Sequence, residues 1–214
     1  GWGGCARRAS GGGASSGRNL TEATNPPATG AAVNSLTPAD FDGTNDKLEH
    51  NLSVDNFFAS AAWSISVLFY ADAADADGGE GYLNPMLIGS GGASLAAVGV
   101  SFSDAGVTAF HKIVASWPKV TVACATAGWH LAQAKYDGTN IKLRIDSGGR
   151  SSQAADNVDA GALAESPLRL GQNHSGSLKF NGKILEAMVS DVCFSDGDED
   201  AIKTYLNARY ALSL

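Results

Sequence analysis

The carboxylates of this sequence offer the most direct route to chemistry, because two of them on one strand face can act as acid and nucleophile. The pair nearest to that arrangement is Glu186 and Asp191 in the run Glu-Ala-Met-Val-Ser-Asp. Their spacing of five places the two side chains on opposite faces of a strand. The four histidines show no pairing that suggests a metal or a nucleophile relay, and no Gly-x-Ser-x-Gly motif is present. The sequence therefore predicts no enzyme.

An acidic segment between two predicted strands offers ligands for a metal ion. Residues 72–80 read Asp-Ala-Ala-Asp-Ala-Asp-Gly-Gly-Glu, with carboxylates at Asp72, Asp75, Asp77 and Glu80. Four carboxylates in a flexible loop suit a hard cation, and calcium is the one cofactor that the sequence suggests. The ligand spacing fails that of an EF-hand. A solvated acidic loop that keeps the surface soluble explains the same residues.

Two loop-like segments carry the residue types of a sugar site. Such a site needs an aromatic platform beside a few polar donors and acceptors. Trp117 could supply the platform, and Gln172, Asn173 and His174 could supply the polar groups. These four residues are the predicted ligand-binding candidates.

Three cysteines, Cys5, Cys124 and Cys193, make neither a disulfide framework nor a zinc pattern. Cys124 and Cys193 stand in apolar surroundings, which predicts buried free thiols. Cys5 lies near the N-terminus, where exposure is expected.

Residues 1–40 predict an irregular Gly/Ser/Pro-rich N-terminal arm ahead of a domain at 41–214, because the arm shows no sustained periodicity. The first 21 residues hold three arginines and no acidic residue. The rest of the chain holds the remaining 12 of the 15 basic side chains and all 22 acidic ones. A basic arm on an acidic body favours contact with a neighbouring subunit, through Trp2, Arg7, Arg8 and Arg18. A loose tail that the arginines keep soluble is the alternative. The acidic body argues against nucleic acid as a partner.

From residue 41 the sequence changes to short strand patterns with turn residues between them. The clearest hairpin joins 129–136 to 141–146 through Asp-Gly-Thr-Asn. The run 184–194 is apolar on both faces, which predicts a central strand. A helix is predicted near the C-terminus, with Ser195 or Asp196 as cap, acidic residues in its first turn, and a buried stripe of Ile202, Tyr205, Leu206 and Tyr210. Many short strands with one terminal helix indicate an all-β sandwich or barrel.

Several groups of residues resemble, in the same order, the motifs of laminin G-like (concanavalin A-like) jelly-roll domains. They are Phe41-Asp42-Gly43-Thr44-Asn45-Asp46, Trp63-Ser64-Ile65-Ser66, Trp129-His130-Leu131-Ala132, Tyr136-Asp137-Gly138, Leu143-Arg144-Ile145-Asp146, Phe180-Asn181-Gly182-Lys183-Ile184-Leu185-Glu186 and the stretch from Ala201 to Tyr210. The resemblance covers about residues 40–212. It implies a two-sheet antiparallel jelly-roll sandwich, with Trp63 and Trp129 in its core. The sequence departs from the pattern at Ser147-Gly148 and in a longer insertion at 72–85.

Stand-alone domains of this kind with short low-complexity arms look most like virion proteins of tailed bacteriophages. The resemblance therefore leads us to expect a non-enzymatic virion structural protein, a head decoration or a tail or spike component, that assembles with copies of itself and with other virion proteins. The alternative is a carbohydrate-binding, lectin-like module for host adhesion that binds surface glycans, with or without calcium. Its location would be the virion if a phage encodes it, and otherwise extracellular.

A third alternative is a divergent glycosidase. Glycoside hydrolases that share this fold use a Glu-x-Asp-x-x-Glu strand, and that spacing is absent from this sequence. No stretch approaches the roughly 20 apolar residues that a membrane span needs, so no membrane partner is expected.

Overall fold

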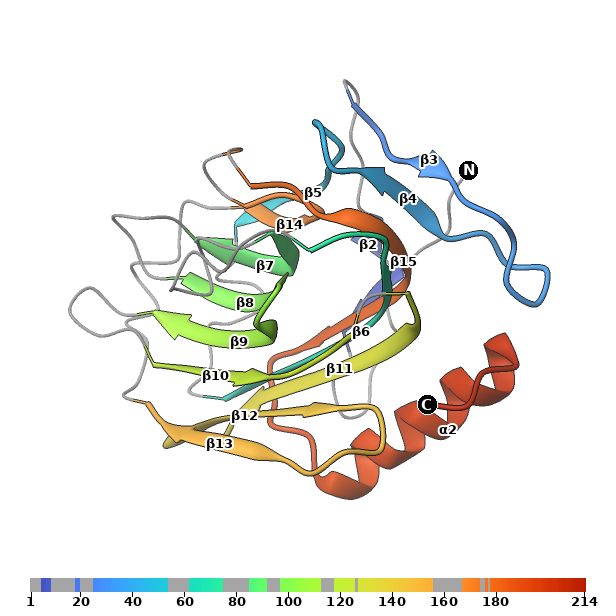
Figure 1. The fold of residues 1–214 in the computed structure, drawn as a ribbon. Coiled ribbons are helices and arrows are strands. Elements are labelled where there is room, and N and C mark those ends of the chain that lie inside the picture. Colours follow the sequence, from blue (N-terminus) through green and yellow to red (C-terminus); the bar gives the residue numbers. More distant parts are fainter. Residues whose placement is uncertain are drawn as a thin grey trace.

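Two β-sheets packed face to face, with one helix on the outside, make up this computed structural model (Figure 1). It describes residues 5–8, 18–19, 25–53, 62–74, 85–91, 97–112, 118–125, 127–155, 167–173, 176 and 178–214. Within these ranges all strand pairs are antiparallel except one. The predicted two-sheet sandwich with a C-terminal helix is confirmed.

The larger sheet is built around two long strands that lie side by side. Its order is β13 (Ser151–Ala154), β12 (Asn140–Ile145), β11 (Trp129–Tyr136), β6 (Trp63–Ala71) and β15 (Asn181–Ser190). The far edge of β15 pairs with β4 (Ala39–Asp42), which is extended by β3 (Ala28–Thr29), and in parallel with β1 (Cys5–Arg8), which is extended by β2 (Arg18–Asn19). The central strand predicted from residue 184 is thus confirmed, although it ends at Ser190.

The smaller sheet faces the larger one across the core. Its order is β10 (Lys119–Val122), β9 (Gly106–Lys112), β8 (Ala97–Ser103), β7 (Met86–Gly91), β14 (Pro167–Leu170) and β5 (Leu48–Ser53).

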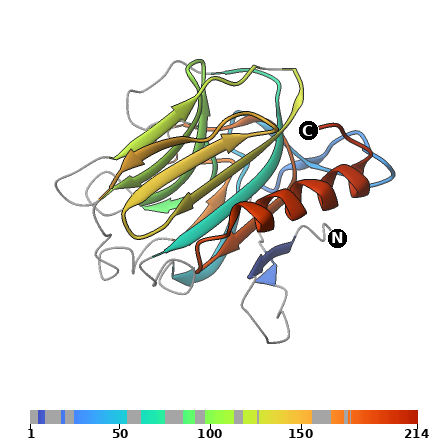
Figure 2. The same cartoon turned by 90° about the horizontal axis from the view of Figure 1, so that it is seen from below.

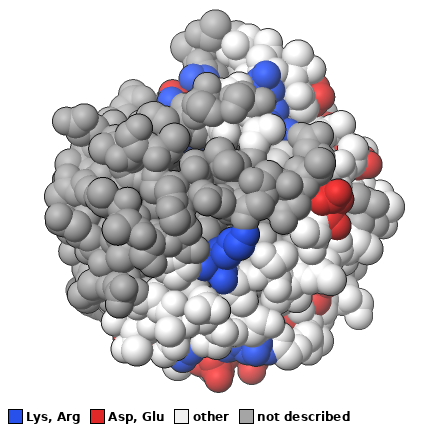
Figure 3. All heavy atoms as spheres, turned by 60° about the vertical axis from the view of Figure 1, so that its left-hand side comes forward, with Lys and Arg blue, Asp and Glu red and all other residues white. Residues whose placement is uncertain are grey.

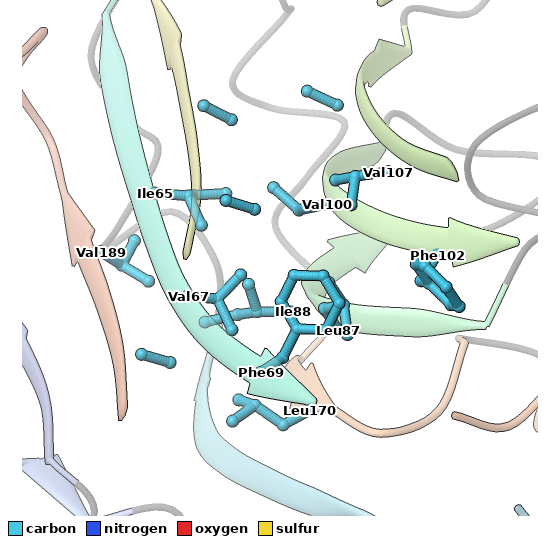
Figure 4. Packing of buried hydrophobic residues seen from close by; sticks show 14 of the residues in the cluster. Ile65, Val67, Phe69, Leu87, Ile88, Val100, Phe102, Val107, Leu170 and Val189 are labelled. Carbon is cyan, nitrogen blue, oxygen red and sulfur yellow. The ribbon is translucent and has the colours of Figure 1, made fainter. Parts of the chain in front are cut away.

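Alternating side chains from both sheets fill the core. In Figure 4, Val67 and Phe69 of β6 point toward Ile88 and Val100 of the smaller sheet. Strand β12 shows the alternation most plainly, because its isoleucines and leucine are buried while Lys142 between them is half-buried. The period-2 pattern of the sequence therefore predicts the correct inward face.

The helix α2 (Asp196–Tyr210) covers the outer face of the larger sheet (Figure 2). Ser195 caps it: its hydroxyl accepts from the Asp198 backbone N–H (3.1 Å), and the Asp198 carboxylate accepts from the Ser195 N–H (2.9 Å). Leu206 and Tyr210 pack on leucines of β6, β11 and β15. No helix in the described ranges is long and apolar enough to cross a membrane.

One residue of the predicted apolar stripe points elsewhere. Tyr205 is 42% exposed, and its hydroxyl accepts a hydrogen bond from Arg209 at 2.8 Å. The stripe of α2 is therefore narrower than the sequence predicts, because the amphipathic ring of Tyr205 lies under a guanidinium at the surface.

Within the predicted arm, the described residues form the short strands β1, β2 and β3. Arg7 and Arg8 lie on β1, which follows β15 in parallel, and Arg18 lies on β2. Trp2 falls outside the described residues. A turn at 33–36 packs against the α2 cluster, and the Asn34 amide donates to the Arg209 carbonyl at 2.7 Å. Part of the arm thus rests on its own domain, and contact of the four arm residues with a neighbouring subunit stays a prediction.

Replacing Gly171 with alanine is expected to lower the free energy of unfolding by about 1–3 kcal/mol. Gly171 stands at φ +83° where the chain crosses from β14 toward β15, and an added Cβ would collide with the ring of Phe41. Urea unfolding measures the effect. Gly149→Ala is the matched control, since no atom lies within 4 Å of its Cβ position. Equal stability of the two variants would contradict the close approach.

Candidate functional site

Four separate segments meet at the end of the sandwich where the chain crosses from one sheet to the other, at the top of Figure 1. They are the turn after β4, the residues after β6, the residue before β7 and the crossover from β14 to β15. Together they enclose a pocket of about 100 Å³, lined by Asp42, Gly43, Ala73, Pro85, Lys179 and Asn181.

The turn after β4 is fixed by two carboxylates. Asp42 Oδ1 accepts from the backbone N–H groups of Thr44 (2.7 Å) and Asn45 (3.4 Å), while Asp46 Oδ2 accepts from the Asp42 N–H (2.9 Å). Gly43 adopts φ +71°, as the Asp-Gly pair predicts. Burial raises the pKa of Asp46. The motif at 41–46 is therefore a rigid turn that presents Asp42 at the pocket.

The crossover hairpin holds two of the predicted ligand residues. Asn173 Oδ1 accepts from the Leu178 N–H at 3.2 Å, and Gln172 Nε2 donates to the Gly176 carbonyl at 3.4 Å. Both side chains are buried. The structure thus places them where they brace the hairpin that carries Lys179 and Asn181 into the pocket. Trp117 and His174, the other two predicted ligand residues, lie outside the described residues.

The acidic insertion begins beside the same pocket. Lys183 Nζ donates to Asp72 Oδ2 at 2.5 Å and lies 3.7 Å from Asp40 Oδ1. Burial alone would lower the pKa of Lys183, but the hydrogen bond to Asp72 and the two negative charges raise it. An ammonium in this position competes with a cation for the Asp72 carboxylate. Asp75, Asp77 and Glu80 fall outside the described residues, and within the described ones no cluster of His, Cys, Asp or Glu could hold a metal ion.

Three polar side chains of different kinds line the pocket without partners in the described part of the chain. They are Oδ2 of Asp42, the ammonium of Lys179 and the amide of Asn181. Gly43 leaves room for Asn181, because a Cβ on the glycine would stand 3.0 Å from the Asn181 Cβ. The set offers one strong acceptor, one charged donor and one group that does both.

Sequence reasoning missed Lys179 and Asn181 and took Asp42 only as a turn residue. A usable sign was the run Lys179-Phe180-Asn181, polar at both ends, at the start of β15, which lies beside the Asp-Gly turn once β15 is known to pair with β4. That pairing joins residues about 140 positions apart, and no local pattern contains it. The predicted site residues Gln172 and Asp72 lie at the same end of the sandwich as the pocket, but they are not among the residues that line it.

The carboxylates first considered for catalysis lie elsewhere. Glu186 is buried beneath α2, where its Oε2 accepts from the Tyr210 hydroxyl at 3.0 Å. Asp191 follows the end of β15. Glu186 therefore serves packing of the helix against the sheet.

Among the described cysteines, Cys124 and Cys193 are free thiols. Both are half-buried, so the prediction that these two thiols are buried is wrong. Each follows the end of a strand, Cys124 after β10 and Cys193 after β15, so neither lies within the alternating pattern that buries the core.

On the face shown in Figure 3, the described Lys and Arg side chains lie in small separate groups, some beside Asp or Glu. A phosphate backbone is bound by a continuous basic track. The described part of this face offers none.

No family model matches the sequence, and no curated protein matches it. Solved structures do match. Domain 4 of AbnA, an extracellular arabinanase of Geobacillus stearothermophilus in complex with arabinotriose, gives a TM-score of 0.58 at 12% identity over 81% of this chain and 76% of that one. The fold is a concanavalin A-like jelly roll.

Two further jelly-roll structures agree with this assignment. The CBM40 domain of a Ruminococcus gnavus sialidase, bound to α2,3-sialyllactose, gives a TM-score of 0.53 at 16% identity over 66% of this chain and 82% of that one. A heptameric SAP-like pentraxin of Limulus polyphemus gives 0.52 at 11% identity over 77% and 80%. At these identities the likeness shows the fold alone.

Proposed function

We propose that this chain is a non-catalytic carbohydrate-binding domain whose pocket between the β4 turn and the crossover hairpin binds hydroxyl groups of a glycan. One observation carries the proposal: Oδ2 of Asp42 and the side chains of Lys179 and Asn181 line a single pocket, and none of these groups has a hydrogen-bond partner among the described residues. A few convergent polar groups on a pre-formed frame are what a small-molecule site requires.

The chemistry of the three groups matches that of a sugar. Each sugar hydroxyl donates one hydrogen bond and accepts others. A carboxylate can take the donated proton, while an ammonium and an amide N–H satisfy the lone pairs. Neighbouring hydroxyls on one ring can therefore engage Asp42, Asn181 and Lys179 together.

The size of the pocket limits how much of a glycan it holds. A volume of about 100 Å³ corresponds to roughly three water molecules. It accommodates the edge of one sugar ring, with the remainder of the glycan outside. We expect a dissociation constant on the order of 0.1–1 mM for a single site, because few ligand atoms are buried.

The frame around the pocket is rigid before any ligand arrives. Asp46 and Gly43 fix the turn, and Asn173 fixes the hairpin. Side chains that already point at the ligand lose little conformational entropy on binding. This compensates in part for the small contact area.

The likenesses reported above support the class of ligand. The arabinanase domain and the CBM40 domain are described in complex with arabinotriose and with sialyllactose. They favour the sugar-binding alternative over the virion role that the sequence put first. Which sugar this chain binds does not follow from them, and assembly on a virion stays a prediction.

A glycan array tests the proposal, with the chain biotinylated and displayed on streptavidin so that millimolar sites are detected through multivalency. We expect binding to at least one oligosaccharide. Calorimetry on that sugar should then show affinity losses of about tenfold or more for Asp42→Asn, Lys179→Met and Asn181→Ala, since each removes a hydrogen bond that involves a charged or amide group.

The control for these variants is Gln153→Ala, an exposed amide on β13 at the far edge of the larger sheet. It should bind as the unchanged chain does. Repeating the array with a chelator separates a direct sugar site from one that needs calcium. No binding to any sugar, or pocket variants that bind like the control, would contradict the proposal.

A further inference from the structure

A row of four side chains, the outer row, crosses the outer face of the larger sheet over β11, β6, β15 and β4 (Figure 1). Its order follows from strand register. Trp129 of β11 pairs with Tyr70 of β6, and Tyr70 pairs with Lys183 of β15. Lys183 in turn pairs with Asp40 of β4. Both chain neighbours of Tyr70 belong to the core between the sheets, so by the alternation of a strand the outer row faces away from that core.

The two aromatic members of the outer row reach the surface. Tyr70 and Trp129 are both half-buried, with ring centroids 5.6 Å apart and ring planes at 64° in an edge-to-face contact. Trp129 also packs against the apolar cluster beneath α2, which fixes its indole. Within the described part of the chain, neither the Tyr70 hydroxyl nor the Trp129 indole N–H has a hydrogen-bond partner. These rings therefore offer apolar surface with polar groups at its edge.

The charged members of the outer row are held in place before any ligand binds. Lys183 Nζ donates to Asp72 Oδ2 at 2.5 Å and lies 3.7 Å from Asp40 Oδ1. It also stands 5.3 Å from the centre of the Tyr70 ring, which adds a cation–π contact. The three charged side chains stay partly exposed, at 22% for Lys183, 40% for Asp72 and 33% for Asp40. Hydroxyl groups of a ligand can therefore reach them.

The outer row continues from the pocket along two strands. Asn181 and Lys183 stand two positions apart on β15, so their side chains lie on one face of the sheet. Asp42 and Asp40 have the same relation on β4, which pairs with β15 in this register. Strand rise and strand spacing put Asn181 and Trp129 roughly 12 Å apart. The combined surface is therefore longer than the one ring edge that the pocket accommodates.

The charges around this combined surface favour a neutral ligand. Three carboxylates and two ammonium groups line the pocket or stand in and beside the outer row: Asp40, Asp42, Asp72, Lys179 and Lys183. The carboxylates outnumber the ammonium groups, so a sugar that carries an acid meets more repulsion than attraction. The hydroxyls of a neutral sugar can donate to the carboxylates and accept from the ammonium groups.

We infer that the outer row is a second part of the glycan site and that the ligand is a neutral oligosaccharide, whose first ring enters the pocket and whose following rings lie on Tyr70 and Trp129. This inference rests on the proposed function. The C–H face of a sugar ring is apolar, so it gains free energy when it displaces water from aromatic surface. The hydroxyls at the edge of the ring can bond the Tyr70 hydroxyl and the Trp129 indole N–H.

Calorimetry of the full chain on a panel of neutral sugars tests the inference. The panel is xylose, glucose, galactose and mannose, each with its β-linked disaccharide and trisaccharide. At least one trisaccharide should bind about tenfold tighter than its monosaccharide, because its further rings cover aromatic surface. Tyr70→Ala should remove that gain and leave the monosaccharide affinity within about twofold. Tyr70→Phe, which keeps the ring, should retain most of the gain.

Two other variants place the effect. Asn181→Ala should weaken binding of the monosaccharide and the trisaccharide alike, because Asn181 lines the pocket. Tyr205→Ala is the matched control, since it removes an exposed tyrosine of α2 that lies outside the outer row, and it should change neither affinity. Monosaccharide binding by Tyr70→Ala shows at the same time that this variant is folded.

Failure of this inference is distinguishable from failure of the pocket proposal. Equal affinity for monosaccharide and trisaccharide, or a gain that survives in Tyr70→Ala, would overturn the second part of the site and leave the pocket proposal standing. Array binding to acidic glycans alone, with none of the neutral panel bound, would overturn the neutral ligand. No binding on either the array or the panel would contradict the pocket proposal, and this inference with it.

Discussion

Replacing Lys135 with methionine is expected to lower the free energy of unfolding by about 3 kcal/mol. The Lys135 side chain is only 5% exposed, and its ammonium donates to Glu199 Oε2 (3.0 Å), Asp196 Oδ1 (2.7 Å) and the Phe194 carbonyl (2.9 Å). Glu199 itself is 1% exposed. Removal of the ammonium leaves a buried carboxylate with one cation fewer, and that desolvated charge is the main cost.

This network fixes the start of α2 to the larger sheet. Arg150 also pairs with Glu199, and Gln133 Nε2 donates to the Glu199 carbonyl at 2.8 Å. Because Arg150 remains in the Lys135→Met variant, we place the loss at the lower end of the range for a broken buried pair. The added change Glu199→Leu should restore part of the stability, since no unpaired charge is then left in the interior.

Urea unfolding at pH 7 measures both variants. Lys142→Met is the matched control: Lys142 lies on neighbouring β12 and pairs with Asp137 at 2.6 Å, but its side chain is 29% exposed. A surface pair of this kind contributes about 0–1 kcal/mol. If Lys135→Met cost no more than Lys142→Met, the buried network would not be what holds the helix.

Lowering the pH from 7 to 4 is expected to cost about 3 kcal/mol at His111 alone. Burial lowers the pKa of His111 to about 3 in the folded state, whereas the unfolded chain titrates near 6.5. Below pH 6.5 the His111 imidazole binds a proton in the unfolded state but not in the folded state. This part of the stability is therefore fully present above pH 6.5 and is lost as the pH falls toward 3.

The geometry around His111 explains why it rejects the proton. The Trp63 indole N–H donates to His111 Nδ1 at 3.1 Å, and Trp offers a donor only, so Nδ1 must be an unprotonated acceptor. Protonation would set two N–H groups against each other in a core where His111 is 1% exposed. The measurement is the unfolding free energy of the unchanged chain and of His111→Gln at several pH values.

Between pH 7 and 4 the unfolding free energy of the unchanged chain should fall by about 3 kcal/mol relative to that of His111→Gln. His130→Gln is the control with the opposite sign. The hydrogen bond with Asp146 raises the pKa of His130 to about 10, so the stabilisation by His130 is complete below pH 6.5 and is lost as the pH rises toward 10. Below pH 5.5 the unfolding free energy of His130→Gln should change with pH in the same way as that of the unchanged chain. A His111→Gln curve parallel to the unchanged chain down to pH 4 would refute the buried neutral histidine.

Local patterns in the sequence predict the elements well where one physical cause dominates. The alternation at 141–145 gives the inward face of β12, the Asp-Gly pairs give the turns, and Ser195 gives the start of α2. Each depends on neighbours within a few residues. The strand partners do not: β15 lies beside β6 although more than a hundred residues separate them.

Lys135 and Glu199 show why long-range contacts escape sequence reasoning. Glu199 suits a helix start through the helix dipole, and Lys135 alternates with apolar neighbours as a solvent-facing residue would. Both patterns are real, yet the helix covers that face of the sheet and brings the two charges together. Tyr205 shows the reverse, since its position predicts burial and its contact with Arg209 keeps it exposed.

The candidate site was predictable in part. Composition identified the crossover loop and the acidic insertion as polar segments, and the structure brings Gln172 and Asp72 to the same end of the sandwich. The pocket wall itself depends on the pairing of β4 with β15, which places Gly43 against Asn181. Only the folded arrangement shows that Asp42, Lys179 and Asn181 converge.

The central claim is that a glycan binds at this pocket, and backbone amide chemical-shift mapping by NMR tests it most directly. The chain labelled with ¹⁵N would be titrated with the best sugar from the array. We expect saturable shifts concentrated at Asp42, Gly43, Lys179 and Asn181, and their loss in Asn181→Ala. Saturable shifts confined to another part of the sandwich, or none at millimolar sugar, would contradict the account.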